Sequence, residues 1–238
     1  MGLEMGAIVE CRKICKTYRQ GQVEVTALSD IDLTVQTGEF MSLAGPSGAG
    51  KTTLLNLIGG LDQPNSGSIR VGGRSYENLN SSQMADLRLN NIGFVFQAYN
   101  LIPVLSALEN VEYVMLLQGT PTGERKQRAR EILDIVGLKD MYHRRPAELS
   151  GGQQQRVAVA RAIVSNPEIV LADEPTANLD SKTGESLLQL MRQMNKERSV
   201  TFIFSTHDDM VMDYARRIVL IRDGHIVEDN YKHQGFAN

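Results

Sequence analysis

The fold of this chain is decided by the stretch Phe40-Met41-Ser42-Leu43-Ala44-Gly45-Pro46-Ser47-Gly48-Ala49-Gly50-Lys51-Thr52. A short apolar strand runs straight into a glycine-rich loop, and residues 51–58 continue as a helix. The loop pattern G-x-x-x-x-G-K-[ST] lets consecutive backbone N–H groups turn inward around phosphate oxygens, and the positive end of the helix favours the same anions. A glycine-rich turn without a ligand is the alternative, and the strand–loop–helix order argues against it. The stretch therefore predicts a phosphate-binding loop in an α/β fold.

Side chains for phosphate chemistry are present in the loop and in a second strand. Lys51 is placed to reach the outer phosphates of a nucleotide, and the Thr52 hydroxyl is placed for Mg²⁺. A carboxylate partner for the metal should end an apolar strand, and Asp173 follows the apolar residues 169–172. Glu174 comes next and is placed to polarise an attacking water as general base. An isolated Asp-Glu pair is commonly a solvated strand end, but behind a phosphate-binding loop it predicts a catalytic pair.

Composition restricts the class of protein. Hydrophobic residues make up 42% and charged residues 22%, which is ordinary for a soluble globular chain, and a net charge of −3 gives no sign of nucleic-acid binding. No apolar run approaches the ~18 residues of a membrane span, and the first residues lack the plan of a signal peptide. Cys11 and Cys15 lack a second ligand pair for zinc and are expected as reduced core side chains. We expect a cytosolic chain that serves a membrane only through a partner.

The order of elements predicts one domain over residues 1–238. Residues 7–35 alternate apolar and polar side chains around a turn, as in antiparallel strands, and residues 107–142 have helical spacing. From residue 169 onward strands and helices alternate, which predicts a mostly parallel sheet covered on both faces, closed by a hairpin at residues 221–227. A short polar tail is expected from Asp229. The helical block, residues 98–166, is predicted to be a subdomain inserted in the α/β core.

With these motifs, five further features resemble the nucleotide-binding subunit of ABC transporters. They are Tyr18, Gln97, the stretch Leu149-Ser150-Gly151-Gly152-Gln153, the loop around Asp180, and His207. Their order and spacing match that family over about residues 8–227. The resemblance implies the ABC ATPase form of the P-loop NTPase fold, with a mostly parallel sheet core, an N-terminal antiparallel β-subdomain and an inserted helical subdomain. It also implies ATP hydrolysis with Mg²⁺.

The resemblance also implies a role for each site residue. Tyr18 would stack on adenine, and Gln97 would contact Mg²⁺ or the lytic water. The Mg²⁺ site would comprise Thr52, Gln97 and Asp173, and catalysis would rest on Lys51, Gln97, Glu174 and His207. ATP would be held by Tyr18 and by the loop residues Gly45, Pro46, Ser47, Gly48, Ala49, Gly50, Lys51, Thr52 and Thr53.

Two copies of the chain are implied by the remaining residues. Ser150, Gly151, Gly152 and Gln153 form the family's signature, which would hold the γ-phosphate bound to the opposite copy from a helix N-terminus. Asp180 would bridge the two copies. Because every element is present, the expectation is a homodimer with two competent sites.

A narrower resemblance is to the MacB, LolD and FtsE group of ABC ATPases. It is carried by residues 23–28, 54–62, 96–101 and 173–180. In that group the ATPase drives a membrane subunit that transmits movement, here expected as a separate integral permease of FtsX/MacB/LolC-like type. Residues 99–105 would form the groove for that subunit, with local packing as the alternative. The chain would then lie at the cytoplasmic face of the bacterial inner membrane.

Three alternatives to this narrower function stay open to different degrees. A channel-type ABC importer or exporter would use the same cassette. A soluble ABC ATPase of DNA or ribosomes is disfavoured because residues 66–148 lack sustained heptads and the chain has one cassette. A GTPase is disfavoured because residues 195–198 lack the final Asp of a guanine-reading motif. The sequence does not name the cargo.

Overall fold

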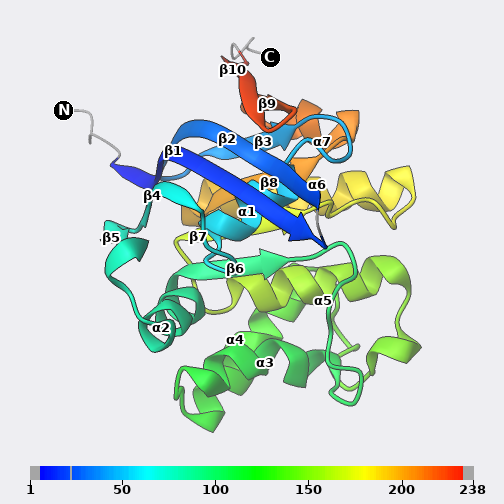
Figure 1. Cartoon of the computed structure of the whole chain (residues 1–238). Coiled ribbons are helices and arrows are strands. Elements are labelled where there is room, and N and C mark those ends of the chain that lie inside the picture. Colours follow the sequence, from blue (N-terminus) through cyan, green and yellow to red (C-terminus); the bar gives the residue numbers. More distant parts are fainter. Residues whose placement is uncertain (1–5, 22, 233–238) are drawn as a thin grey trace, which may run out of the picture.

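Two β-sheets form the frame of the protein in the computed structural model, which describes residues 6–21 and 23–232 (Figure 1). The expectation that the chain lacks a signal segment rests on its first residues, and residues 1–5 lie outside this description. Among the described residues no helix combines the length and the apolar character that a membrane crossing needs.

The first sheet is antiparallel, as the alternation of residues 7–35 predicted. Its strand order is β2-β1-β4-β5. Along β2 the apolar side chains Ile31, Leu33 and Val35 are buried, while the polar side chains between them face water. This two-residue period fixes which face packs on the core. The bounds are β1 Ala7–Gln20, β2 Val23–Gln36, β4 Ser66–Val71 and β5 Arg74–Ser75.

The second sheet is mostly parallel and carries the phosphate-loop strand in its middle. The strand order is β10-β9-β3-β8-β7-β6, with only β10 antiparallel to its neighbour. Every residue of β3 and β8 is buried, which is typical of parallel strands covered on both faces. The bounds are β3 Phe40–Ala44, β6 Ile92–Val95, β7 Ile169–Asp173, β8 Thr201–Thr206, β9 Arg217–Arg222 and β10 His225–Tyr231. The loops after β3, β7 and β8 therefore meet at one edge of the sheet.

Three helices lie together beyond β6 (Figure 1). They are α3 (Ala107–Leu117), α4 (Thr122–Ile135) and α5 (Gly151–Ile163), and they share a buried apolar cluster with residues such as Val111, Leu133 and Val157. The predicted helical spacing of this block is confirmed. The division into a separate subdomain at residues 98–166 stays a prediction.

The other helices flank the parallel sheet. Helix α1 (Lys51–Ile58) follows the phosphate loop, α6 (Ser181–Arg198) follows β7, and α7 (Asp209–Tyr214) follows β8. Asp180 caps α6, since its carboxylate accepts the backbone N–H of Thr183 at 3.1 Å.

Two features differ from the sequence expectation. Helix α2 (Ser81–Asn91) was not predicted, because it buries only Leu87 and so lacks an apolar stripe. Its N-terminus is marked by a capping box between Asn80 and Gln83. Residues 229–231, expected to begin a polar tail, instead belong to β10, where Asp229 forms an ion pair of 2.7 Å with Arg217; the rest of the expected tail, residues 233–238, lies outside the described residues.

Candidate active site

A hollow of about 420 Å³ opens at the edge where β3, β7 and β8 end. The phosphate loop, the end of β7 and the residue after β8 line it from one side, and Val25, Thr26 and Ala27 of β2 line it from another. The predicted site residues in its lining are Ser47, Gly48, Ala49, Gly50, Lys51, Thr52, Thr53, Gln97, Asp173, Glu174 and His207. The fold thus gathers side chains from across the sequence around one space.

Glycine is required at two points of the phosphate loop. Gly50 has a φ of 105°, and a Cβ there would lie 2.5 Å from the carbonyl oxygen of Ala27. Gly45 has a φ of 147°, and a Cβ there would collide with the carbonyl oxygen of Ile221. Only glycine combines this backbone with so close an approach of neighbouring strands. The loop is therefore held tightly against β2 and β9.

The ammonium group of Lys51 lies inside the loop. The residue is only 6% exposed, and its Nζ donates to the carbonyl oxygens of Gly45 and Pro46 at 2.7 and 2.9 Å. A buried cation held by carbonyl dipoles, with no carboxylate among these partners, is placed to attract an anion.

Thr52 and Asp173 meet between α1 and β7. The Thr52 hydroxyl donates to Oδ1 of Asp173 at 3.0 Å. Hydroxyl and carboxylate oxygens are the ligands that Mg²⁺ prefers, and it commonly takes few protein ligands together with substrate phosphates. The described residues contain no group of three or more His, Cys, Asp or Glu side chains that could hold an ion alone. The pair therefore fits a magnesium ion brought in with a nucleotide.

Glu174 is fixed by its backbone and by two neighbours. It has a φ of 45°, unusual for a residue other than glycine, and its N–H donates to the carbonyl oxygen of Ser205 at 2.9 Å. The carboxylate is 14% exposed; one oxygen accepts from the Thr206 hydroxyl at 3.1 Å, and the other lies 2.7 Å from Nδ1 of His207. A carboxylate held in this way keeps one orientation toward the hollow.

Gln97 and Asp180 lie in loops that are joined by Asn178. The Asn178 side chain donates to the backbone oxygen of Gln97 at 2.9 Å. Asp180 is fully exposed, and hydrogen bonds from the side chain and then the backbone of Thr183 hold the pKa of its carboxyl below the usual value. Gln97 lines the hollow, and Asp180 does not.

The signature residues begin helix α5, away from the hollow. Ser150 caps the helix and forms a capping box with Gln153: the Ser150 hydroxyl accepts the Gln153 N–H at 3.3 Å, and the Gln153 side chain accepts the Ser150 N–H at 2.9 Å. Gly152 lies against α6, since a Cβ there would be 2.5 Å from the methyl group of Thr183. Neither Ser150, Gly151, Gly152 nor Gln153 lines the hollow.

Tyr18 also lies outside the lining of the hollow. The residue is 37% exposed, and its hydroxyl donates to Oδ2 of Asp62 at 2.7 Å. Neither this contact nor the place of three β2 residues in the lining was predicted from the sequence. No motif marks them, because the antiparallel sheet brings them to the site through long-range pairing.

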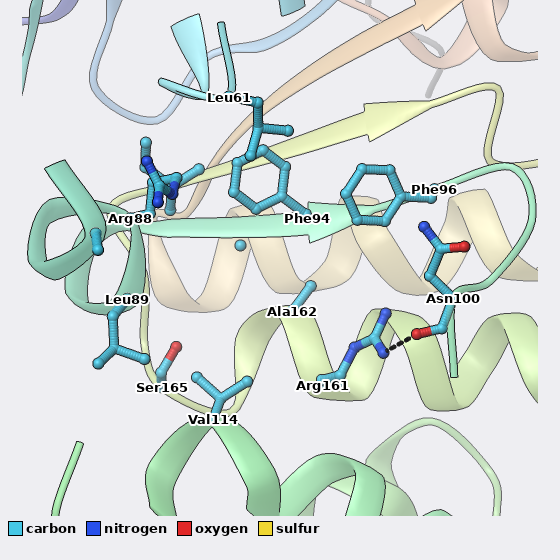
Figure 2. Close-up of a pocket in the computed structure, with 13 residues that line it drawn as sticks. Leu61, Arg88, Leu89, Phe94, Phe96, Asn100, Val114, Arg161, Ala162 and Ser165 are labelled. Atoms are coloured by element: carbon cyan, nitrogen blue, oxygen red, sulfur yellow. Dashed lines mark hydrogen bonds between the residues drawn. The ribbon is translucent and has the colours of Figure 1, made fainter. Parts of the chain in front are cut away.

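A second hollow, of about 390 Å³, lies beside β6 (Figure 2). The rings of Phe94 and Phe96 are stacked, 5.6 Å apart and nearly parallel, and both line it. Arg161 of α5 extends toward Asn100 and donates to the backbone oxygens of Asn100 and Tyr99 at 2.5 and 2.9 Å. Burial lowers the pKa of Arg161 from its usual value. Residues 99 and 100 are thereby tied to α5.

Comparisons with known proteins agree with this geometry. Residues 28–177 match the family model described as "ABC transporter". An ABC transporter ATP-binding protein of Thermotoga maritima is 47% identical, over 93% of this chain and 94% of that protein. A macrolide export ATP-binding/permease protein, MacB of Azoarcus sp., is 46% identical over 93% of this chain, which spans only 34% of that longer protein.

A solved structure is similar over nearly the whole chain. It is the dimeric, post-hydrolysis state of the ATP-binding cassette MJ0796 bound to ADP and Pi, with a TM-score of 0.88 and 42% identity over 94% of this chain and 98% of that one. The P-loop, the two sheets and the family match lead to one conclusion: this chain belongs to the ABC transporter family, as an ATP-hydrolysing ATP-binding cassette.

Proposed function

We propose that two copies of this chain face each other head to tail and bind ATP between them. The observation that carries this proposal is the separation within one copy: the hollow holds Lys51 and Glu174, and Ser150 at the start of α5 is not in its lining. A second copy could supply that helix N-terminus to the γ-phosphate, where backbone donors and the helix dipole favour an anion. The dimeric state of the similar cassette supports this arrangement.

ATP would be held by the loop and by Tyr18. Lys51 would exchange its bonds to loop carbonyls for the β- and γ-phosphates, and Tyr18 would stack on the adenine. Backbone N–H groups of Gly45, Ser47, Gly48, Ala49, Gly50, Thr52 and Thr53 would wrap the phosphates, and Pro46, which has no N–H, would complete the loop around them. Mg²⁺ bound at Thr52, Gln97 and Asp173 would neutralise developing phosphate charge.

Hydrolysis would use the carboxylate of Glu174. The carboxylate would accept a proton from the attacking water. The hydrogen bond from the Glu174 N–H to the carbonyl oxygen of Ser205, and the bond from the Thr206 hydroxyl to the carboxylate, would keep it in place. The bond between Nδ1 of His207 and Glu174 leaves Nε2 as the ring atom that can face the γ-phosphate. Asp180, Gly151, Gly152 and Gln153 would contact the opposite copy.

The hollow beside β6 would receive a membrane permease subunit of FtsX/MacB/LolC-like type. Its apolar side chains Phe94, Phe96 and Leu61 suit the apolar face of a short helix, and within the helical block, residues 98–166, Arg161 ties residues 99 and 100 to α5. Movement of that block would then be transmitted to the partner. Such a partner would place the chain at the cytoplasmic face of the inner membrane. A channel-type permease is the second candidate, since the same groove would serve it.

The test is capture of the partner from native membranes. Tagged Glu174→Gln cassette is purified with Mg-ATP, and bound proteins are identified by mass spectrometry. We expect an integral membrane protein with few spans and a large extracytoplasmic domain. Leu61→Glu, in the hollow beside β6, should lose this partner. Val227→Glu is the matched control and should keep it, because Val227 is equally exposed (49% against 48%) but does not line that hollow. A many-span permease would favour the second candidate, and capture of soluble proteins alone would contradict a transport role.

A further inference from the structure

Tyr18 belongs to a cluster of polar contacts that no catalytic step above uses. Asp62, in the segment after α1, accepts the Tyr18 hydroxyl on one oxygen and pairs with Nζ of Lys16 on the other, both at 2.7 Å. Lys16 also donates to the backbone oxygen of Gln63 at 2.7 Å. One carboxylate therefore joins an aromatic and a cation from β1 to the segment that follows the phosphate-loop helix.

The same segment is joined to β1 by further bonds. The Asn65 side chain accepts the backbone N–H of Thr17 at 2.7 Å, and the Asn65 N–H donates to the carbonyl oxygen of Cys15 at 2.9 Å. The N–H of Leu61 donates to the backbone carbonyl oxygen of Asn56, in α1, at 2.9 Å. Tyr18 is thus connected through residues 61–65 to the helix that carries Lys51 and Thr52.

Lys16 and Asp62 form an ion pair that keeps both side chains charged. Lys16 is only 9% exposed, so its ammonium group needs a paired carboxylate. Burial alone would raise the pKa of Asp62, but hydrogen bonds from Lys16, Tyr18 and the Gln63 N–H outweigh it and keep that pKa below the usual value. Asp62 therefore stays an anion that accepts from three donors.

The geometry also fixes which face of the Tyr18 ring is available. Nζ of Lys16 lies 4.9 Å from the ring centroid, within the range of a cation–π contact. With one face covered by this cation and the hydroxyl bound at its edge, the half-exposed ring offers its other face. A ring held in this way loses little rotational freedom when a base stacks on it.

We propose that Asp62 is a positioning residue for nucleotide binding, which fixes the Tyr18 ring through its hydroxyl so that one face receives the adenine base. This inference rests on the stacking role of Tyr18 in the proposed function. Lys16 supports Asp62 and covers the opposite face of the ring. The cluster thereby sets the ring relative to the phosphate loop through the segment after α1.

The test compares ligands with and without a base. Affinities of the full chain for ATP and for inorganic tripolyphosphate, both with Mg²⁺, are measured by calorimetric titration for Tyr18→Phe, Asp62→Ala, the double variant and Tyr18→Ala. We expect Tyr18→Phe and Asp62→Ala each to weaken ATP binding by about three- to tenfold, the range of one hydrogen bond. Tripolyphosphate affinity should not change. The double variant should bind ATP no more weakly than Asp62→Ala alone, since Asp62→Ala already removes the contact with the Tyr18 hydroxyl.

Tyr231 offers a matched control. Its hydroxyl donates to a carboxylate oxygen of Glu39 at 3.2 Å, and the guanidinium of Arg217 lies 5.1 Å from its ring centroid. Tyr231 therefore has the same kinds of contact as Tyr18, a carboxylate and a cation, and it does not line the nucleotide hollow. Tyr231→Phe should bind ATP like the wild type.

The outcomes separate the two proposals. If Tyr18→Ala binds ATP as tightly as the wild type, base stacking by Tyr18 is wrong. If Tyr18→Ala weakens ATP binding but Tyr18→Phe and Asp62→Ala do not, stacking stands and the positioning role is overturned. Equal losses for ATP and tripolyphosphate would show a general structural effect and would also overturn it. Should Asp62→Ala fail to fold, Tyr18→Phe decides alone.

Discussion

At the residue scale, the chemistry depends on how Glu174 is held. A residue other than glycine at a φ of 45° is strained, and the surrounding structure must compensate for it. Here the compensation comes from the hydrogen bond that the Glu174 N–H donates to the carbonyl oxygen of Ser205, and from the contacts of the carboxylate with Thr206 and His207. The strain directs the carboxylate to the hollow, where water would be activated.

We expect Glu174→Gln to lower the rate of ATP turnover by about 10²- to 10⁴-fold, the usual contribution of a general base. ATP affinity should stay within about twofold, because the amide occupies the same space and no bond to the phosphates is lost. Steady-state hydrolysis and calorimetric titration measure the two quantities. Glu185→Gln, the same change at an exposed position of α6, is the control and should leave both unchanged. Turnover within tenfold of the wild type would argue against Glu174 as the base.

Motif spacing was enough to predict most residues of the hollow. Lys51, Thr52, Asp173 and Glu174 follow from strand ends and a loop pattern that phosphate chemistry requires. The contribution of β2 and the contact between Tyr18 and Asp62 could not be predicted in this way. They depend on pairing between segments that are distant in sequence and carry no local signal.

At the scale of elements, the start of α5 has two roles: Ser150 caps the helix, and we propose that it also contacts the nucleotide of the opposite copy. Ser150 and Ser106 cap α5 and α3 with the same capping box, and the two hydroxyl-to-N–H distances are both 3.3 Å. Only Ser150 lies in the signature. The two serines therefore allow the cap and the contact with nucleotide to be measured separately.

We expect Ser150→Ala and Ser106→Ala to lower the free energy of unfolding by similar amounts, about 1 kcal/mol, as expected for loss of an N-cap. Urea unfolding measures this loss. Only Ser150→Ala should also reduce ATP hydrolysis and ATP-dependent dimer formation. If both variants reduce hydrolysis equally, the effect of Ser150 is stability alone and the signature role is wrong.

The elements that sequence patterns missed share a physical reason. Helix α2 is polar on nearly all sides, and the part of β10 beyond the predicted hairpin at residues 221–227 is held at the sheet edge by the ion pair of Asp229 with Arg217. Hydrophobic periodicity detects only faces that become buried, so neither segment gave a signal. The elements with buried faces, such as β3, β7 and α1, were predicted within a few residues of their observed bounds.

At the scale of the whole molecule, one copy holds half of each proposed site. The phosphate loop, the proposed Mg²⁺ residues and the proposed base line the hollow, while the start of α5 is not in its lining. A dimer would complete two sites at once, and each γ-phosphate would join the two copies. Hydrolysis would remove that link, so each cycle of ATP binding and hydrolysis would close and then open the dimer.

The most direct test of this account is the mass of Glu174→Gln in solution with Mg-ATP, measured by size-exclusion chromatography with light scattering. The account predicts a species of about twice the 26.3 kDa chain mass with ATP, and a monomer without nucleotide. A second substitution, Ser150→Ala, should weaken that dimer. A mass of 26.3 kDa at every saturating ATP concentration would contradict the composite site.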